Sequence, residues 1–339
     1  MISANPFAFV ALSWIWSLAS TGGRWYIGPM QELPEIFLER LKRILPESCW
    51  EPTLQSFRNP RAVVFRFNRI KPPSEFKTTP GLKVRTVAWY EDAFVLVQGT
   101  IRDLQNTPAY EEGGLYIQEL SSMVPVLLLE PQPGEQVLDL TAAPGSKTGQ
   151  IAALMKNTGR ILANDVSRAR FFKMKANLEK LGVSNVEYSV AKGENVGRRL
   201  REKFDRVLLD APCSGEGRFH LTDPESFQEW KLSKMKGLVP RQKMLFYSAW
   251  QTLKPGGVLV YSTCTFAPEE NEGILDWAIE KFPDLEMLPA ELAIQNRMDG
   301  LTSWGKHAYH PSVAKALRIL PADGMEGFFA AKMRKKRAE

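Results

Sequence analysis

Residues that build disulfide frameworks and metal sites are scarce in this sequence. Its 339 residues include only three cysteines, Cys49, Cys213 and Cys264, and three histidines. An odd and widely spaced set of cysteines argues against a disulfide framework and indicates a reducing compartment, so we expect a cytoplasmic protein. Neither residue type shows the spacing of zinc ligands, and we predict no bound metal.

Long apolar runs are also missing. The segment Phe7–Ala19 is apolar but shorter than the ~20 residues of a membrane span. No Lys or Arg precedes it, as one would in a signal peptide. We therefore predict no membrane association. We interpret residues 1–29 as a peripheral or spurious extension, with Met30 as the functional start.

Residues 30–110 are predicted to form a small α+β domain. Apolar residues recur at helical spacing from Gln31 to Leu45, and Pro46 ends that helix. Alternating patterns then predict short strands. The expected strands are Arg61–Asn68, Val84–Tyr90 and Ala93–Val97, with the last two paired around Glu91-Asp92.

This first domain interleaves basic and aromatic residues, in a chain whose formal net charge is +6. Such a mixture fits a nucleic-acid surface, with charges for phosphates and rings for bases. It fits equally well a strand whose phenylalanines face the core and whose arginines are solvated. We predict an RNA-binding domain and leave the second interpretation open. The residues concerned are Arg58, Arg61, Arg66, Arg69 and Lys71 with Phe57, Phe65 and Phe67.

Strand and helix patterns alternate from residue 132 onward, inside a predicted catalytic domain at residues 111–333. Such alternation predicts an α/β fold with a parallel sheet covered by helices on both faces. A ligand of such a sheet lies outside the carboxyl ends of the strands. A terminal strand pair and a basic tail at residues 334–339 follow. The expected strands are 136–140, 160–165, 186–190, 204–210, 257–262, 317–320 and 328–332.

The first of these strands runs into the glycine-containing loop Asp139–Thr148, which precedes a helix. Glycine lets the backbone approach a ligand closely, but neither the dinucleotide pattern nor the phosphate-loop pattern is complete. The second strand ends in Asp165, placed to accept hydrogen bonds from ribose hydroxyls. Two acids after successive strands favour S-adenosylmethionine, which is cationic. The alternative is that both acids cap helices.

Two cysteines follow neighbouring strands, in Asp210-Ala-Pro-Cys213 and Ser262-Thr-Cys264. A lone cysteine is usually a small core residue, but two at this edge indicate chemistry. Carbon 5 of cytosine attacks a methyl donor only after a thiolate has added to carbon 6. An acid must support N3, for which Asp210 is well placed, and a base must later remove the proton from carbon 5.

Together these segments resemble the Nop/Sun (Sun/Fmu) family of RNA cytosine-5 methyltransferases, over roughly Gln31 to Lys332. The resemblance implies a Rossmann-like methyltransferase fold with a mostly parallel seven-stranded sheet and a small N-terminal α+β domain. Further matching segments are Arg66-Phe-Asn68, Gly114–Ser122 and Arg318–Ala330.

The resemblance also implies the roles of the site residues. Cys264 is the nucleophile, Cys213 assists breakdown of the adduct, and Lys147 lies near cofactor and base. Chemistry alone leaves the two cysteines unassigned, because DNA-type enzymes attack with the cysteine of the Pro-Cys position. The predicted catalytic residues are Cys264, Cys213, Asp210 and Lys147. The predicted residues for S-adenosylmethionine are Thr141, Ala142, Ala143, Pro144, Gly145, Ser146, Lys147, Asp165, Arg170 and Asp210.

Two positions depart from the family pattern. Thr141 replaces a usual cysteine, which we expect to be harmless. Lys192-Gly-Glu194 replaces a usual Asp-Gly-Arg after the third strand, so either Glu194 substitutes from a shifted position or an adenine contact is lost.

The expected partner is tRNA or rRNA, with the target cytosine single-stranded or flipped, and we expect a monomer. Two alternatives remain: a methyltransferase acting on an exocyclic amine, and an RNA-binding assembly factor without turnover. Basic segments are candidate RNA contacts, although charge runs are more often solvated surface. These are Arg198, Arg199 and Arg201, the run Lys231–Lys243, and the tail Lys332–Arg337.

Overall fold

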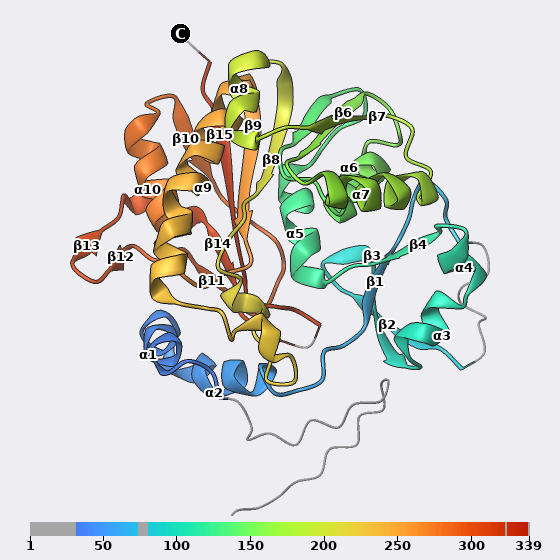
Figure 1. Cartoon of the computed structure of the whole chain (residues 1–339), viewed down its shortest axis with the longest axis horizontal. Coiled ribbons are helices and arrows are strands. Elements are labelled where there is room, and N and C mark those ends of the chain that lie inside the picture. Colours follow the sequence, from blue (N-terminus) through green and yellow to red (C-terminus); the bar gives the residue numbers. More distant parts are fainter. Residues whose placement is uncertain (1–31, 74–80, 323, 338–339) are drawn as a thin grey trace, which may run out of the picture. The chain divides into compact units, whose positions relative to one another are not determined.

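A computed structural model of the chain describes residues 32–73, 81–322 and 324–337 (Figure 1). The residues from Leu33 onward form one compact unit. The predictions for residues 1–29 and Met30 lie outside the described residues. No helix in the described part is long and apolar enough to cross a membrane.

The larger sheet confirms the predicted α/β fold. Five parallel strands run from one edge of the sheet in the order β7-β6-β5-β8-β9, and antiparallel strands continue beyond β9. In the described part the sheet has nine strands, two more than predicted, because short β10 and β11 add to its antiparallel side. The strands are β5 (Gln136–Asp139), β6 (Arg160–Asp165), β7 (Val186–Val190), β8 (Phe204–Asp210), β9 (Leu253–Thr263), β10 (Leu285–Leu288), β11 (Arg297–Asp299), β14 (Leu317–Ile319) and β15 (Phe328–Lys335).

Helices cover both faces of this sheet, because alternate strand residues are apolar on each side. Leu208 and Val260 belong to the core beneath α5 and α6, while their neighbours Leu209 and Tyr261 belong to the core beneath α9 and α10. The helices are α5 (Leu120–Leu129), α6 (Ser146–Leu154), α7 (Arg168–Lys180), α8 (Val196–Arg199), α9 (Leu232–Thr252) and α10 (Glu272–Lys281).

Two helix predictions needed correction. The sequence pattern predicts a helix near Val239–Leu253, but α9 begins at Leu232, since Gly237 and Pro240 obscure its pattern without breaking the helix. α5 was not predicted, because it is apolar all round and contains Pro125. It is buried against α6 and the strands, and a helix that is apolar on every side shows no amphipathic period.

The smaller sheet is antiparallel, in the order β2-β3-β1-β4. The turn between β2 and β3 lies at Ala88 and Trp89, so the prediction of a turn at Glu91-Asp92 was wrong. Buried Tyr90 already belongs to β3. The fourth strand lies beyond the expected domain boundary near residue 110. The strands are β1 (Val64–Phe67), β2 (Lys83–Val87), β3 (Tyr90–Gln98) and β4 (Leu115–Ile117). The short helices α3 (Ile101–Gln105) and α4 (Pro108–Glu111) lie between β3 and β4 in the chain.

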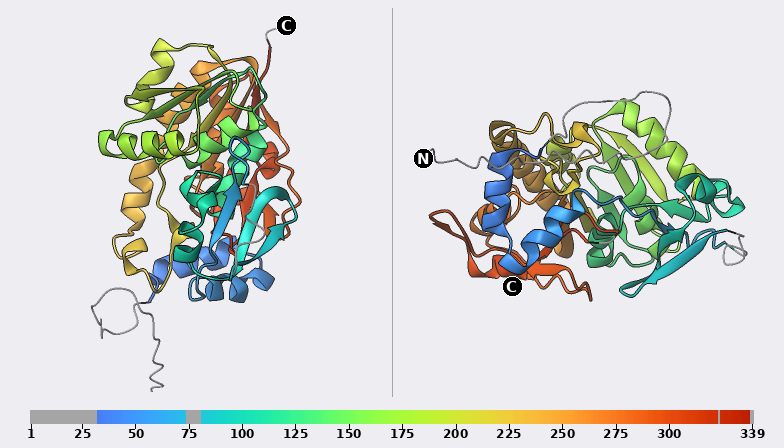
Figure 2. Two further views of the ribbon diagram at one scale, coloured as in Figure 1. Left: turned by 90° about the vertical axis from the view of Figure 1, so that its right-hand side faces the viewer. Right: turned by 90° about the horizontal axis from the view of Figure 1, so that it is seen from below.

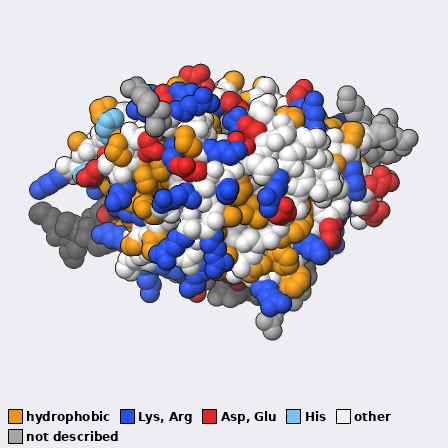
Figure 3. Space-filling model, turned by 90° about the horizontal axis from the view of Figure 1, so that it is seen from above, with side chains coloured by type: hydrophobic (Ala, Val, Ile, Leu, Met, Phe, Trp, Pro, Cys, Tyr) orange, Lys and Arg blue, Asp and Glu red, His pale blue; other side chains and the backbone are white. Residues whose placement is uncertain are grey.

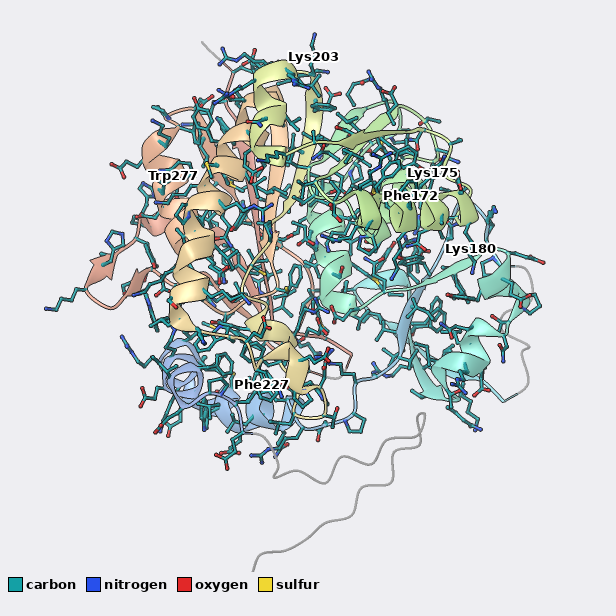
Figure 4. All side chains as sticks on the ribbon, viewed as in Figure 1. Phe172, Lys175, Lys180, Lys203, Phe227 and Trp277 are labelled. Carbon is teal, nitrogen blue, oxygen red and sulfur yellow. The ribbon has the colours of Figure 1, made fainter. Side chains whose placement is uncertain are left out.

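The first two helices pack on the catalytic part rather than on the small sheet (Figure 2). They are α1 (Glu35–Ile44) and α2 (Glu47–Ser56), and α2 was not predicted because Pro52 lies inside it. Phe37 of α1 meets Phe219 with ring centroids 4.8 Å apart. Phe227 contributes to the same cluster (Figure 4). A small hairpin of β12 (Ser303–Trp304) and β13 (His307–Ala308) lies near α10.

Arg66 fits neither interpretation offered for the basic strand, because it is fully buried. Its Nε donates to Gln118 Oε1 at 2.9 Å and its Nη2 to the Ser146 carbonyl at 3.2 Å. Asn68 donates in turn to the carbonyls of Gly113 and Leu181. Both residues therefore join the small sheet to the catalytic part, and neither is available as an RNA-binding surface.

The last strand is longer than the predicted 328–332 and extends into the expected basic tail. Arg334 and Lys335 belong to β15, and Lys335 is buried, with its Nζ 2.8 Å from Glu202 Oε1. The expected tail at residues 334–339 is therefore partly an ordered strand.

Candidate active site

The structure brings the two predicted cysteines together at the carboxyl edge of the large sheet. Cys213 follows β8 and Cys264 follows β9, and these strands are parallel neighbours. The two Sγ atoms lie 3.3 Å apart, and the Cys264 backbone N–H donates to Cys213 Sγ at the same distance. Both side chains are partly buried.

Cys213 is held as a thiol in this arrangement. Its hydrogen bond with Cys264, followed by burial, raises the pKa of the Cys213 thiol well above its ordinary value. Two thiolates so close together would repel each other, so only one of the pair ionises readily.

Lys147 and Asp210 form an ion pair beside the thiols. Lys147 is buried in the first turn of α6, with its Nζ 2.7 Å from Asp210 Oδ2 and 2.8 Å from Ser122 Oγ. Ser262 Oγ donates to the other carboxylate oxygen, Oδ1, at 2.7 Å. The structure therefore brings together the predicted residues Lys147 and Asp210, and the catalytic role of Lys147 stays a prediction. Ser122 and Ser262 were missed as site residues, although both stand inside segments quoted for the family resemblance.

The predicted cofactor loop, Thr141–Ser146, connects β5 to the amino end of α6. Gly145 has φ +97°, and a Cβ added there would lie 3.2 Å from Met174 Cγ, so the turn requires glycine. The Thr141 hydroxyl donates to the Asp210 carbonyl at 2.8 Å. The loop and the Lys147–Asp210 pair are thus directly linked.

The two strand-ending acids differ in role. Asp139 is buried and accepts from Thr148 Oγ1 at 2.7 Å, which supports the alternative that it holds the following helix. Burial raises its pKa to about 7. Asp165 accepts backbone N–H groups from Ala143 and Ser167, and the Arg170 guanidinium lies 3.7 Å away. Each Asp165 oxygen retains a lone pair for a further donor.

The rim beside Asp165 fits an adenosine group. Val166 and Val190 stand at the ends of the neighbouring strands β6 and β7 and are 48% and 47% exposed. Exposed valines next to a carboxylate that retains lone pairs can cover the faces of an adenine ring. Neither valine was predicted. Glu194 forms an ion pair with Arg241 at 3.0 Å. In the departure Lys192-Gly-Glu194, this pairing competes with the explanation that Glu194 substitutes for the usual acid.

No group of three or more His, Cys, Asp or Glu side chains within residues 32–73, 81–322 and 324–337 could hold a metal ion. The absence of a metal requirement stays a prediction.

Comparison with known proteins identifies the family. The sequence model for 16S rRNA methyltransferase RsmB/F matches residues 126–334, and the model for the N-terminal domain of 16S rRNA methyltransferase RsmF matches residues 33–120. This chain belongs to the RsmB/F methyltransferase family. The predicted resemblance and the predicted methyltransferase fold are therefore confirmed.

Individual relatives show how similar the chain is to other members of this family. The chain is 38% identical over 316 residues to ribosomal RNA small subunit methyltransferase F of Vibrio campbellii, and 36% identical over 322 residues to that of Klebsiella pneumoniae. These matches cover 91% and 90% of this chain but 64% of each relative, so the chain spans just under two thirds of their length.

Solved structures agree with this assignment. A methyltransferase homolog protein from Pyrococcus horikoshii is 33% identical, with a TM-score of 0.74, covering 89% of this chain and all of that one. NSun6 from the same organism, solved with SFG, has the same TM-score at 24% identity and shows the shared fold.

Proposed function

We propose that this chain methylates carbon 5 of a cytosine in RNA, with S-adenosylmethionine as methyl donor. The observation that carries this proposal is the pair of sulfurs 3.3 Å apart, beside the Lys147–Asp210 ion pair. Methylation of an exocyclic amine requires no thiol, and an assembly factor without turnover requires no buried lysine beside the thiols. The names of its relatives favour small-subunit rRNA over tRNA as substrate. A monomer in the cytoplasm is part of this proposal.

The first half of the reaction uses Cys264 and the ion pair. The Cys264 thiolate forms a bond to carbon 6, and the electron pair of the C5–C6 double bond shifts toward N3. N3 takes a proton from the Lys147–Asp210 pair, which recovers it when the ring is restored. Lys147 and Ser262 fix both oxygens of Asp210, so the carboxyl group needs no reorientation as charge develops.

Bound S-adenosylmethionine supplies the methyl group from its sulfonium sulfur. The residues proposed to hold it are the loop Thr141–Ser146, the Asp165 carboxylate toward the ribose, and Val166 and Val190 around the adenine. Arg170 braces the loop, since its guanidinium donates to the Ala143 carbonyl.

The second half of the reaction uses Cys213. Once Cys264 Sγ is bonded to carbon, it no longer raises the pKa of Cys213, and that thiol can release its proton to solvent. The Cys213 thiolate then takes the proton from carbon 5. The released electron pair restores the C5–C6 double bond, and the bond between carbon 6 and Cys264 breaks, which regenerates the Cys264 thiolate.

The basic segments contribute unequally to the proposed RNA surface. α9 enters β9 at the amino edge, so its first half, with Lys231, Lys234 and Lys236, lies toward the thiols. Arg198, Arg199 and Arg201 precede β8 and therefore lie at the opposite edge. On the face seen from above, Lys and Arg are interspersed with Asp and Glu (Figure 3). Such a mixture of charges is typical of ordinary solvated surface.

The test is a denaturing gel after incubation with transcribed small-subunit rRNA and S-adenosylmethionine. Cys213→Ala should accumulate a covalent RNA–protein adduct, because breakdown is slowed. Cys264→Ala should form neither adduct nor 5-methylcytosine. Methylation by Cys264→Ala would show that the mechanism is wrongly assigned.

A further inference from the structure

Two buried side chains hold the peptide groups on either side of Cys213. Gln242 of α9 donates from Nε2 to the Pro212 carbonyl at 3.0 Å and to Glu270 Oε2 at 2.8 Å. The Ser214 N–H donates to the same Glu270 oxygen at 3.0 Å. Gln242 and Glu270 are both fully buried. Cys213 thus lies between two peptide groups that Gln242 and Glu270 hold by hydrogen bonds.

The orientation of the Gln242 amide follows from its neighbours. Its Nε2 faces two acceptors, so the donor end of the amide must point there. In the described structure its Oε1 is buried without a hydrogen-bond partner. Burying an unpaired oxygen is unfavourable, so the contacts with Pro212 and Glu270 are kept at a cost elsewhere in the same side chain.

The segment that carries Glu270 also holds the second cysteine. The next residue, Asn271, donates from Nδ2 to the Thr265 carbonyl at 2.9 Å and accepts from Thr263 Oγ1, so it fixes both neighbours of Cys264. The Glu270 carbonyl accepts from the buried Tyr261 hydroxyl at 2.7 Å, which anchors this segment to β9. Adjacent residues of one segment therefore set where each sulfur lies.

We infer that Gln242 and Glu270 are positioning residues that hold Cys213 against Cys264, so that breakdown of the RNA adduct depends on them more than its formation does. In the part of the chain that the structure describes, the hydrogen bonds of these two side chains go to groups other than the sulfurs. The inference rests on the proposed function, in which Cys264 attacks first and Cys213 acts later. Loosening the Pro212–Ser214 segment moves Cys213 and leaves the attacking sulfur in place.

The experiment compares Gln242→Leu and Glu270→Gln with wild type and with Cys213→Ala. Leucine keeps the bulk of Gln242 without its donor, and glutamine keeps the shape of Glu270 without its charge. Ser248→Ala is the matched control, because Ser248 is a buried residue of the same helix whose hydroxyl bonds Gly193 and Gly197 instead. Each protein is incubated with transcribed small-subunit rRNA and S-adenosylmethionine.

Gln242→Leu and Glu270→Gln should each lower turnover by about tenfold and raise the fraction of gel-stable adduct several-fold. The rate of adduct formation in a single turnover should change by less than about threefold. Ser248→Ala should keep the wild-type adduct fraction. Equal losses of formation and turnover, or a wild-type adduct fraction in both variants, would overturn the inference. If Cys213→Ala itself gives no adduct, the proposed function fails, and the inference falls with it.

A second measurement needs no RNA. Diamide oxidises two neighbouring thiols to a disulfide and is itself reduced to the hydrazine, so the rate of Cys213–Cys264 disulfide formation reports how well the sulfurs are held together. Gln242→Leu should slow this reaction relative to Ser248→Ala. Equal rates in the two variants would contradict a positioning role.

Discussion

The two edges of the large sheet are built from the same strands but hold their charges differently. At the amino edge, ion pairs such as Arg206–Glu135 and Lys254–Asp205 remain partly exposed. At the carboxyl edge, Arg318 and Glu272 are both buried, and Asp210, although 29% exposed, is held at both carboxylate oxygens by buried Lys147 and Ser262. Exposed ion pairs contribute little to stability and need no further side chains to hold them. Buried charges persist only when they are fully paired. Chemistry is therefore expected where polar groups are buried and held, rather than where charge is most abundant.

The sharpest test of this difference is neutralisation of one ion pair at each edge. Asp210→Asn should reduce kcat by about 10²–10⁴-fold, because N3 of the cytosine loses its acid. Arg206→Met at the amino edge should leave kcat within about threefold of wild type. Methyl transfer from labelled S-adenosylmethionine measures both. Similar losses in the two variants would remove the functional distinction between the edges.

Stability should show the same contrast. Arg318 and Glu272 are buried, with Arg318 Nη2 2.6 Å from Glu272 Oε2. Arg318→Met leaves Glu272 charged and unpaired, and should lower the free energy of unfolding by about 3–5 kcal/mol. Lys254→Met breaks a pair that is more than a third exposed on the lysine side and should cost at most about 1 kcal/mol. Urea denaturation compares them, and equal costs would contradict the contrast.

A pH dependence should originate at the carboxyl edge. Burial raises the pKa of Glu216 from 4.5 to about 7. Between these values the unfolded chain has already lost the proton that the folded protein keeps, so stability falls as pH rises through this window. Glu216→Gln should remove a slope on the order of 1–3 kcal/mol between pH 5 and 8. Its amide can still accept from Trp230 Nε1, as Glu216 does. An unchanged slope in urea titrations would exclude Glu216 as a source.

The smallest effects should come from surface charge. Replacing Lys231, Lys234 and Lys236 with Gln should raise KM for RNA by about threefold to tenfold and reduce its salt dependence. The matched triple replacement of Arg198, Arg199 and Arg201 should change KM by less than about twofold, because these residues lie at the other edge. Methylation rates across a salt series distinguish the two, and the reverse ranking would place the RNA on the amino edge.

Much of the fold could be predicted because local pattern and tertiary role agree there. The parallel strands and their carboxyl-edge residues follow from short apolar runs ending in Asp139, Asp165 and Asp210. α2 and α5 could not be predicted in this way, because an internal proline and an all-apolar surface remove the helical period. The turn before Tyr90 was misplaced for a related reason, since acidic residues in a strand resemble turn residues until their burial and pairing are known.

Sequence patterns were enough to identify the family, the order of the strands along the chain and the two cysteines that follow neighbouring strands. Tertiary structure alone decided the rest of the site. Ser122 and Ser262 both belong to the network around Asp210, and Gln242 reaches Glu270. No spacing along the chain relates these residues to one another. Tertiary structure also decided that Arg66 is buried rather than exposed. Periodicity records which face of an element is apolar, but the partner of a polar group depends on which elements the fold brings together.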